Sequence, residues 1–140
     1  MRIELLTYNY SGISFKYKKY IEEVCQKVLL EVLPKINPVI SEVELSLVLV
    51  TPGVALELNK VWRKKRYIPA DLSFPNFERL DLKKNKERSI ILGDIFLTPE
   101  LILGKENYKK MVVHSLLHLL GYDHENEKDF KKMQKLEQTL

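Results

Sequence analysis

Residues 42–51, EVELSLVLVT, constrain the fold more than any other segment, because polar and apolar side chains alternate strictly along them. Successive side chains of a β-strand point to opposite faces of a sheet, so the apolar residues of this segment share one face. They are Val43, Leu45, Leu47 and Leu49. We therefore expect a strand with one apolar face here.

The remaining patterns predict an α+β fold, in which a small mixed sheet of about four strands packs with helices. Further strands are expected at residues 2–8, 71–75 and 89–97, and prolines favour an edge position for the second of them. Apolar residues at helical spacing predict helices at 15–33 (ended by Pro34), 52–63, from Thr98-Pro99 to Gly121, and in the last segment through Phe130, Met133 and Leu136. The rest of residues 64–88 is expected to be irregular.

Length and composition suit one globular domain over residues 1–140, because 45% of the residues are hydrophobic and 30% are charged. The single cysteine, Cys25, cannot form an internal disulfide; we expect it to be buried, in a reducing, cytoplasmic compartment. No segment approaches the roughly 20 apolar residues of a membrane span, so no membrane contact is expected. The net charge of +4 permits an anionic partner but does not require one.

All three histidines lie within residues 114–124, HSLLHLLGYDH. His114 and His118 are four residues apart and share one face of the expected helix. Gly121 ends that helix, so the chain can turn and bring His124 back as a third ligand. Three imidazoles leave one position of a tetrahedral zinc ion open for water, as in catalytic zinc sites. We expect one Zn²⁺ per chain on this zincin-like helix, although nickel or copper would bind the same ligands.

The spacing of the histidines equals that of the metzincin proteases, HExxHxxGxxH. The glutamate that acts there as general base is replaced by Ser115, and a hydroxyl does not take a proton from water at neutral pH. The sequence thus favours a metal-dependent hydrolase without the metzincin mechanism. The alternative is that the histidines are core residues hydrogen-bonded to backbone or carboxylate groups.

A basic segment, residues 60–67, combines cations with Trp62 and Tyr67. Cations neutralise phosphates and aromatic rings stack on unpaired bases, which suits single-stranded RNA. The alternative is a solvated loop with Trp62 partly in the core. Two carboxylates also stand out: Asp94, as either an anchor for the site or a surface group, and Asp123, as a group that orients an imidazole.

The histidine segment closely resembles the signature of the YbeY family, bacterial endoribonucleases of ribosomal RNA maturation. Three further segments are similar to family motifs in the same order: LNKVWRKKR (58–66), DLSFP (71–75) and LGDIFL (92–97). Met133 and Glu137 match the family as well. Two departures stand out. Ser115 replaces a glycine, and Pro69-Ala70-Asp71 replaces the family's Pro-Thr-Asp with a shifted register.

The resemblance implies a zinc-dependent endoribonuclease selective for single strands, which processes the 3′ end of small-subunit rRNA and serves ribosome quality control. Its partners would be RNA and the ribosome or ribosomal proteins. Arg63 matches the family's functional arginine, so we expect it to hold the phosphate and, with His114, to be catalytic. Substrate binding is expected at Arg63, Lys64, Lys65 and Arg66. Two alternatives stay open: a metallo-hydrolase of another substrate, such as a peptide, and a ribosome assembly factor with a mainly structural metal.

Overall fold

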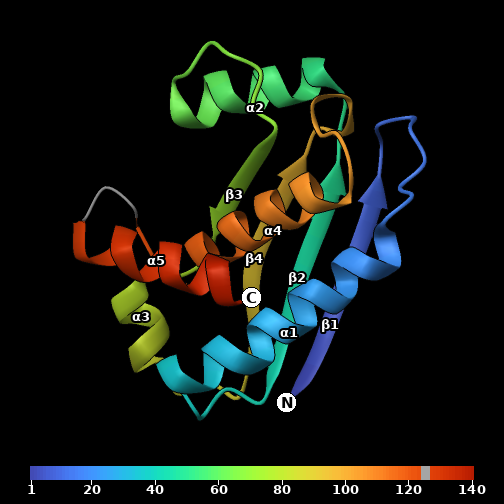
Figure 1. Ribbon diagram of the computed structural model, residues 1–140. Helices are drawn as coiled ribbons and strands as arrows, with labels where there is room; N and C mark the ends of the chain where they lie inside the picture. Colours follow the sequence, from blue (N-terminus) through green and yellow to red (C-terminus); the bar gives the residue numbers. More distant parts are fainter. Residues whose placement is uncertain (124–126) are drawn as a thin grey trace.

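A four-stranded mixed sheet forms the centre of the molecule in the computed structural model, which describes residues 1–123 and 127–140 (Figure 1). The strand order is β1-β2-β4-β3. β1, β2 and β4 are parallel, and β3 runs antiparallel to β4. The strands are β1 (Arg2–Asn9), β2 (Glu42–Leu49), β3 (Asp71–Pro75) and β4 (Ser89–Leu97). The predicted α+β class, the mixed sheet and the edge position of 71–75 are all confirmed.

Helices α1 and α4 pack against each other across one face of the sheet, and α5 packs against α4 (Figure 1). The helices are α1 (Lys18–Ile36), α2 (Pro52–Arg63), α3 (Arg79–Lys84), α4 (Lys105–Leu119) and α5 (Glu127–Thr139), with a short 3-10 helix, η1 (Pro99–Leu101). Within the described residues, no helix combines the length and apolar character needed to cross a bilayer.

The alternating strand β2 supplies the centre of the core, as its sequence predicts. Its four apolar residues of the expected face are 0 to 2% exposed. Helix α4 packs on the neighbouring strands β3 and β4, and its buried residues belong to the same core: Val112, Val113, Leu116 and Leu117. Fully burying one such side chain stabilises the fold by about 1.5–3 kcal/mol. The helix that carries the histidines is therefore fixed rigidly on the sheet.

Two expected helix boundaries are wrong. Pro34 does not end α1, which continues to Ile36, because a proline this close to the end costs few hydrogen bonds and the Asn37 amide still bonds to the Leu33 carbonyl at 2.9 Å. Thr98 does not cap the histidine helix. Its hydroxyl donates instead to the Pro69 carbonyl at 2.8 Å.

The chain after Thr98 accordingly forms η1 first, and α4 begins only at Lys105, after Gly104 with a positive φ of 84°. Helix α3 was not predicted, because the sequence pattern indicated an irregular segment there. It forms because Leu82 is fully buried and the Asn37 side chain donates to the Leu82 and Asn85 carbonyls. Local spacing does not reveal these distant partners.

Candidate metal and RNA site

A cleft of about 700 Å³ lies beside the C-terminal half of α4. Its walls come from the end of α2, from β3, from the start of α3 and from the turn after α4. His114 and His118 line it together with Arg63 and Asp71. Residues predicted to act together thus meet in one cavity, although Arg63 lies 51 positions before His114 in the sequence.

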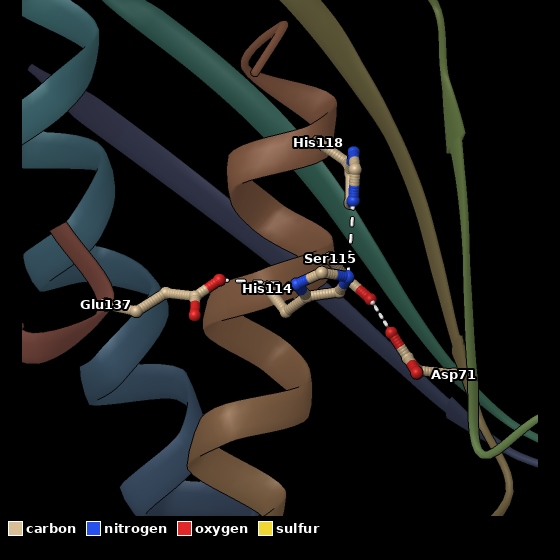
Figure 2. Close-up of polar contacts among 5 residues, drawn as sticks. All are labelled: Asp71, His114, Ser115, His118 and Glu137. Atoms are coloured by element: carbon tan, nitrogen blue, oxygen red, sulfur yellow. Dashed lines mark hydrogen bonds and ion pairs between the residues drawn. The ribbon is translucent and has the colours of Figure 1, made fainter. Parts of the chain in front are cut away.

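The imidazole planes of His114 and His118 are nearly perpendicular, at 82°, and their Nε2 atoms lie 3.2 Å apart (Figure 2). Two nitrogens bound to a tetrahedral zinc ion at about 2.0–2.1 Å would be about 3.3 Å apart. The pair therefore fits two adjacent positions around such an ion. His124, the predicted third ligand, lies outside the described residues, and within those residues no three His, Cys, Asp or Glu side chains group closely enough to hold a metal.

Helix α5 brings a carboxylate to the other side of the first histidine. Glu137 Oε1 lies 3.2 Å from His114 Nδ1 (Figure 2). A carboxylate here accepts a hydrogen bond from Nδ1–H, which leaves the Nε2 lone pair directed at a metal. The sequence match at Glu137 gave no such role. Its spacing of four from the buried Met133 was the available signal, because it places both residues on the same side of α5.

The side chains of His114 and Glu137 are both partly open to solvent. The His114 side chain is 39% exposed and that of Glu137 is 34% exposed. The apolar residues of α4 face the sheet, whereas the imidazoles face the cleft. The histidines are therefore open to a substrate from solvent.

Strand β3 supplies a second carboxylate that sequence analysis left without a role. The Ser115 hydroxyl, which is 1% exposed, donates to Asp71 Oδ2 at 2.6 Å (Figure 2). Asp71 is half-buried and lines the cleft. Ser115 and the segment Pro69-Ala70-Asp71 were the two departures noted in the sequence, and that coincidence was the one signal that could have paired Ser115 with Asp71.

The basic segment is divided by the end of α2. Arg63, the last residue of the helix, lines the histidine cleft, whereas Lys64 takes a left-handed conformation with φ 58° and turns the chain away. A separate hollow of about 400 Å³ is lined by Lys60, Lys64, Lys65 and Arg66. The structure thus brings Arg63 to the histidines, but not the other three predicted contacts.

The aromatic residues of this segment lie at the surface. Trp62 is 68% exposed, so the alternative that it lies partly in the core is wrong; its ring meets Phe74 edge-on at 6.4 Å between centroids. Tyr67 is 53% exposed and lines the cleft. The Arg79 guanidinium lies 4.9 Å from the centre of the Tyr122 ring. Both residues line the cleft, and the sequence gave no sign of either.

Two other predictions concern single residues. Asp94 is half-buried in β4, in register with Phe74, and is absent from the described residues that line the cleft. Asp123 does line the cleft, and its orienting role stays a prediction. Cys25 is buried, as expected, and burial together with the charge of Glu22 raises the pKa of its thiol to about 12.

By sequence, the chain is similar to proteins named Endoribonuclease YbeY. The family model described as Endoribonuclease YbeY matches residues 7–140. A protein named Endoribonuclease YbeY from Mesomycoplasma hyopneumoniae is 35% identical over 150 residues, covering 100% of this chain and 95% of its own. One of the same name from Bartonella bacilliformis is 32% identical over 132 residues, covering 88% and 82%. A solution structure of TM1509 from Thermotoga maritima has a TM-score of 0.48 and 24% identity, covering 96% of this chain and 86% of that one.

Proposed function

Because the chain belongs to the YbeY family, we propose that it is a zinc-dependent endoribonuclease, specific for single strands, that acts on ribosomal RNA in the cytoplasm. Within that role we include maturation of the 3′ end of small-subunit rRNA and ribosome quality control. The observation that carries the proposal is the pair of imidazole Nε2 atoms 3.2 Å apart in one cleft with Arg63.

The metal would be held by His114, His118 and His124. When bound, zinc lowers the pKa of a water ligand and polarises a phosphoryl oxygen. Glu137 keeps a proton on Nδ1 of His114 and so fixes the ring for this task. Arg63 binds two oxygens of the scissile phosphate with its planar fork and offsets the charge that develops there.

The RNA would approach over the basic hollow of Lys60, Lys64, Lys65 and Arg66 and enter the cleft past Tyr67. The cations bind phosphates without regard to sequence, and the exposed ring of Tyr67 can stack on a base only where the RNA is unpaired. This combination supports selectivity for single strands, whose bases are open to stacking.

The decisive experiment is an assay of purified, nuclease-free protein with measured zinc content on end-labelled single-stranded RNA and on the same RNA as a duplex. We expect internal cuts in the single strand, little cutting of the duplex, and loss of cutting in His114→Ala. A peptide substrate and a ribosome-binding assay run in parallel. Peptide hydrolysis would support a hydrolase of another substrate class. Ribosome binding without RNA cleavage at full metal content would support an assembly factor.

A further inference from the structure

We propose that Asp71 is a catalytic residue, which accepts the proton of the water that attacks the scissile phosphate, and that Ser115 is the positioning residue that aims it. This inference rests on the proposed endoribonuclease function. It supplies the proton acceptor that is missing where metzincins carry a glutamate, because Ser115 stands at that position. The carboxylate comes from strand β3 instead of from the histidine helix.

The hydrogen bond from Ser115 fixes the Asp71 carboxylate relative to the histidines. At 2.6 Å from oxygen to oxygen, it has the length of a charge-assisted bond between a hydroxyl and a carboxylate. Ser115 is 1% exposed and directly follows His114 on α4, which is packed rigidly on the sheet. The hydrogen bond from Ser115 therefore holds the Asp71 carboxylate in a fixed position relative to the two imidazoles (Figure 2).

The geometry suits a proton acceptor better than a metal ligand. Asp71 lines the same cleft as His114 and His118, yet within residues 1–123 and 127–140 the three do not form a group close enough to share an ion. Only Oδ2 is used by Ser115, and Oδ1 has no hydrogen-bond partner among the described residues. One oxygen is thus held while the other is available to a water molecule in the cleft.

The negative charge of Asp71 excludes a role in binding the RNA phosphates. A carboxylate repels a phosphate, so Asp71 does not bind the RNA backbone, whereas Arg63 in the same cleft does so with the opposite charge. Two other carboxylates line the cleft, those of Glu78 and Asp123, but both residues are exposed. Asp71 is the half-buried member of the three, and it is held by a buried hydroxyl.

The proposed step balances with water alone. The water oxygen forms a bond to phosphorus while the bond from phosphorus to the leaving nucleotide oxygen breaks. Asp71 takes one proton from the water as that bond forms. The leaving oxygen then receives a proton, from Asp71 or from solvent, and the products are a terminal phosphate monoester and a hydroxyl end. Nothing is oxidised or reduced, and Asp71 returns to its carboxylate form.

The first test compares single-turnover cleavage of single-stranded RNA by wild type and Asp71→Asn. The amide keeps the shape of the side chain and its acceptor oxygen for Ser115 but does not take the proton. We expect a rate loss of about 100-fold or more at saturating RNA, the usual scale for a lost general base. Zinc content by elemental analysis should stay unchanged, and the half-saturating RNA concentration should not rise, because the amide does not repel the phosphate. Asp94→Asn is the matched control, since it removes a half-buried carboxylate of the same sheet away from the cleft.

A second variant tests the chemistry if the amide disturbs folding. Formate should restore part of the rate to Asp71→Ala, where it fills the space of the lost carboxylate, but not to wild type or Asp71→Asn. The role of Ser115 is tested by Ser115→Ala, expected to lose rate at unchanged zinc content. The double variant Ser115→Ala with Asp71→Asn should be no slower than Asp71→Asn alone, because Ser115 acts only through the carboxylate.

Several outcomes would overturn this assignment while leaving the endoribonuclease proposal intact. These are a wild-type rate in Asp71→Asn, loss of zinc from that variant, absence of formate rescue, and a cyclic phosphate among the products, which would identify the RNA 2′-hydroxyl as the attacking group. Failure of wild-type protein with full zinc content to cut any RNA would instead refute the proposed function itself, and this inference with it.

Discussion

The Glu137 carboxylate of helix α5 lies 3.2 Å from Nδ1 of His114 on helix α4, on the side of the ring away from His118 (Figure 2). The last helix is therefore part of the candidate metal site. Removing a carboxylate that holds a metal-binding imidazole commonly lowers metal affinity by roughly 10–100-fold. That loss is on the order of 1–3 kcal/mol of binding free energy.

Glu137→Ala should accordingly weaken zinc binding by roughly 10–100-fold, with a smaller loss in Glu137→Gln, whose amide oxygen still accepts a hydrogen bond. Competition with a coloured zinc chelator measures the affinity. Gln138→Ala, an exposed neighbour on α5, is the control and should bind zinc normally. Equal affinities in all four proteins would remove Glu137 from the metal site.

The histidines should together bind one zinc ion per chain. Replacing any one of His114, His118 and His124 by alanine should remove most of the metal, because three ligands converge on the ion and two hold it poorly. Elemental analysis of protein dialysed against buffer without metal gives the stoichiometry. Unchanged zinc content in the triple variant would place the metal elsewhere.

Substitutions of Arg63 and of the basic hollow should have different effects in kinetic assays. Arg63→Ala should lower the cleavage rate at saturating RNA with zinc content intact, and Arg63→Lys should recover only part of it, because lysine lacks the fork that bonds two phosphate oxygens. Lys65→Ala should mainly weaken RNA binding, and that loss should shrink as salt is raised. The same change of rate in Arg63→Ala and Lys65→Ala would mean that both cations only bind the RNA backbone.

Gly93 is needed where β4 passes beside β3. It has φ 149°, and an added Cβ would collide with the backbone carbonyl of Phe74 and come within 3.0 Å of the Leu119 side chain. Gly93→Ala should therefore lower the free energy of unfolding by more than about 1 kcal/mol. Gly53→Ala in α2 is the matched control: it meets open space and should stabilise by about 0.4–1 kcal/mol. Denaturant titration measures both, and a neutral Gly93→Ala would contradict the close approach.

Cys25 should be inert in the folded protein and should make stability depend on alkaline pH. Burial raises the pKa of its thiol from 9.0 to about 12, so above pH 9.0 the unfolded chain loses a proton that the folded chain keeps. The free energy of unfolding should then fall with rising pH, by up to about 1.4 kcal/mol per pH unit. Cys25→Ala should lack this component. Rapid reaction of native Cys25 with a thiol reagent at pH 8 would contradict its burial.

Elements with a strong internal period were predictable from the sequence, and elements held by distant partners were not. The alternation of β2 and the spacing of His114 and His118 are properties of single segments, so they identified a strand and a ligand-bearing helix. Helix α3 depends on Asn37, 45 residues before Leu82, whose side-chain amide donates a hydrogen bond to the Leu82 carbonyl. The six residues of α3 alone, RLDLKK, are too few and too charged to show a helical period.

The same physical difference runs through the candidate site. Arg63 and the histidines were assigned from residue type, spacing and family resemblance. Glu137 and Asp71 were not assigned, because their roles arise from pairs 23 and 44 residues apart in the sequence. Thr98 shows the opposite error: its local pattern is that of a helix cap, but its hydroxyl is used by Pro69 on a neighbouring segment.

The position of Glu137 on helix α5 also determines the order in which the parts of the candidate site are synthesised. Ribosomes make and release N-terminal segments first, so Arg63, Asp71 and both described histidines leave the ribosome before helix α5. Until α5 docks, His114 has no carboxylate to fix which ring nitrogen carries its proton. In a growing chain, His114 and His118 are therefore present before the carboxylate that orients the His114 ring. The candidate site is complete only after helix α5 has been made. Zinc binding by the candidate site should therefore reach its full affinity only after helix α5 has been made and has docked.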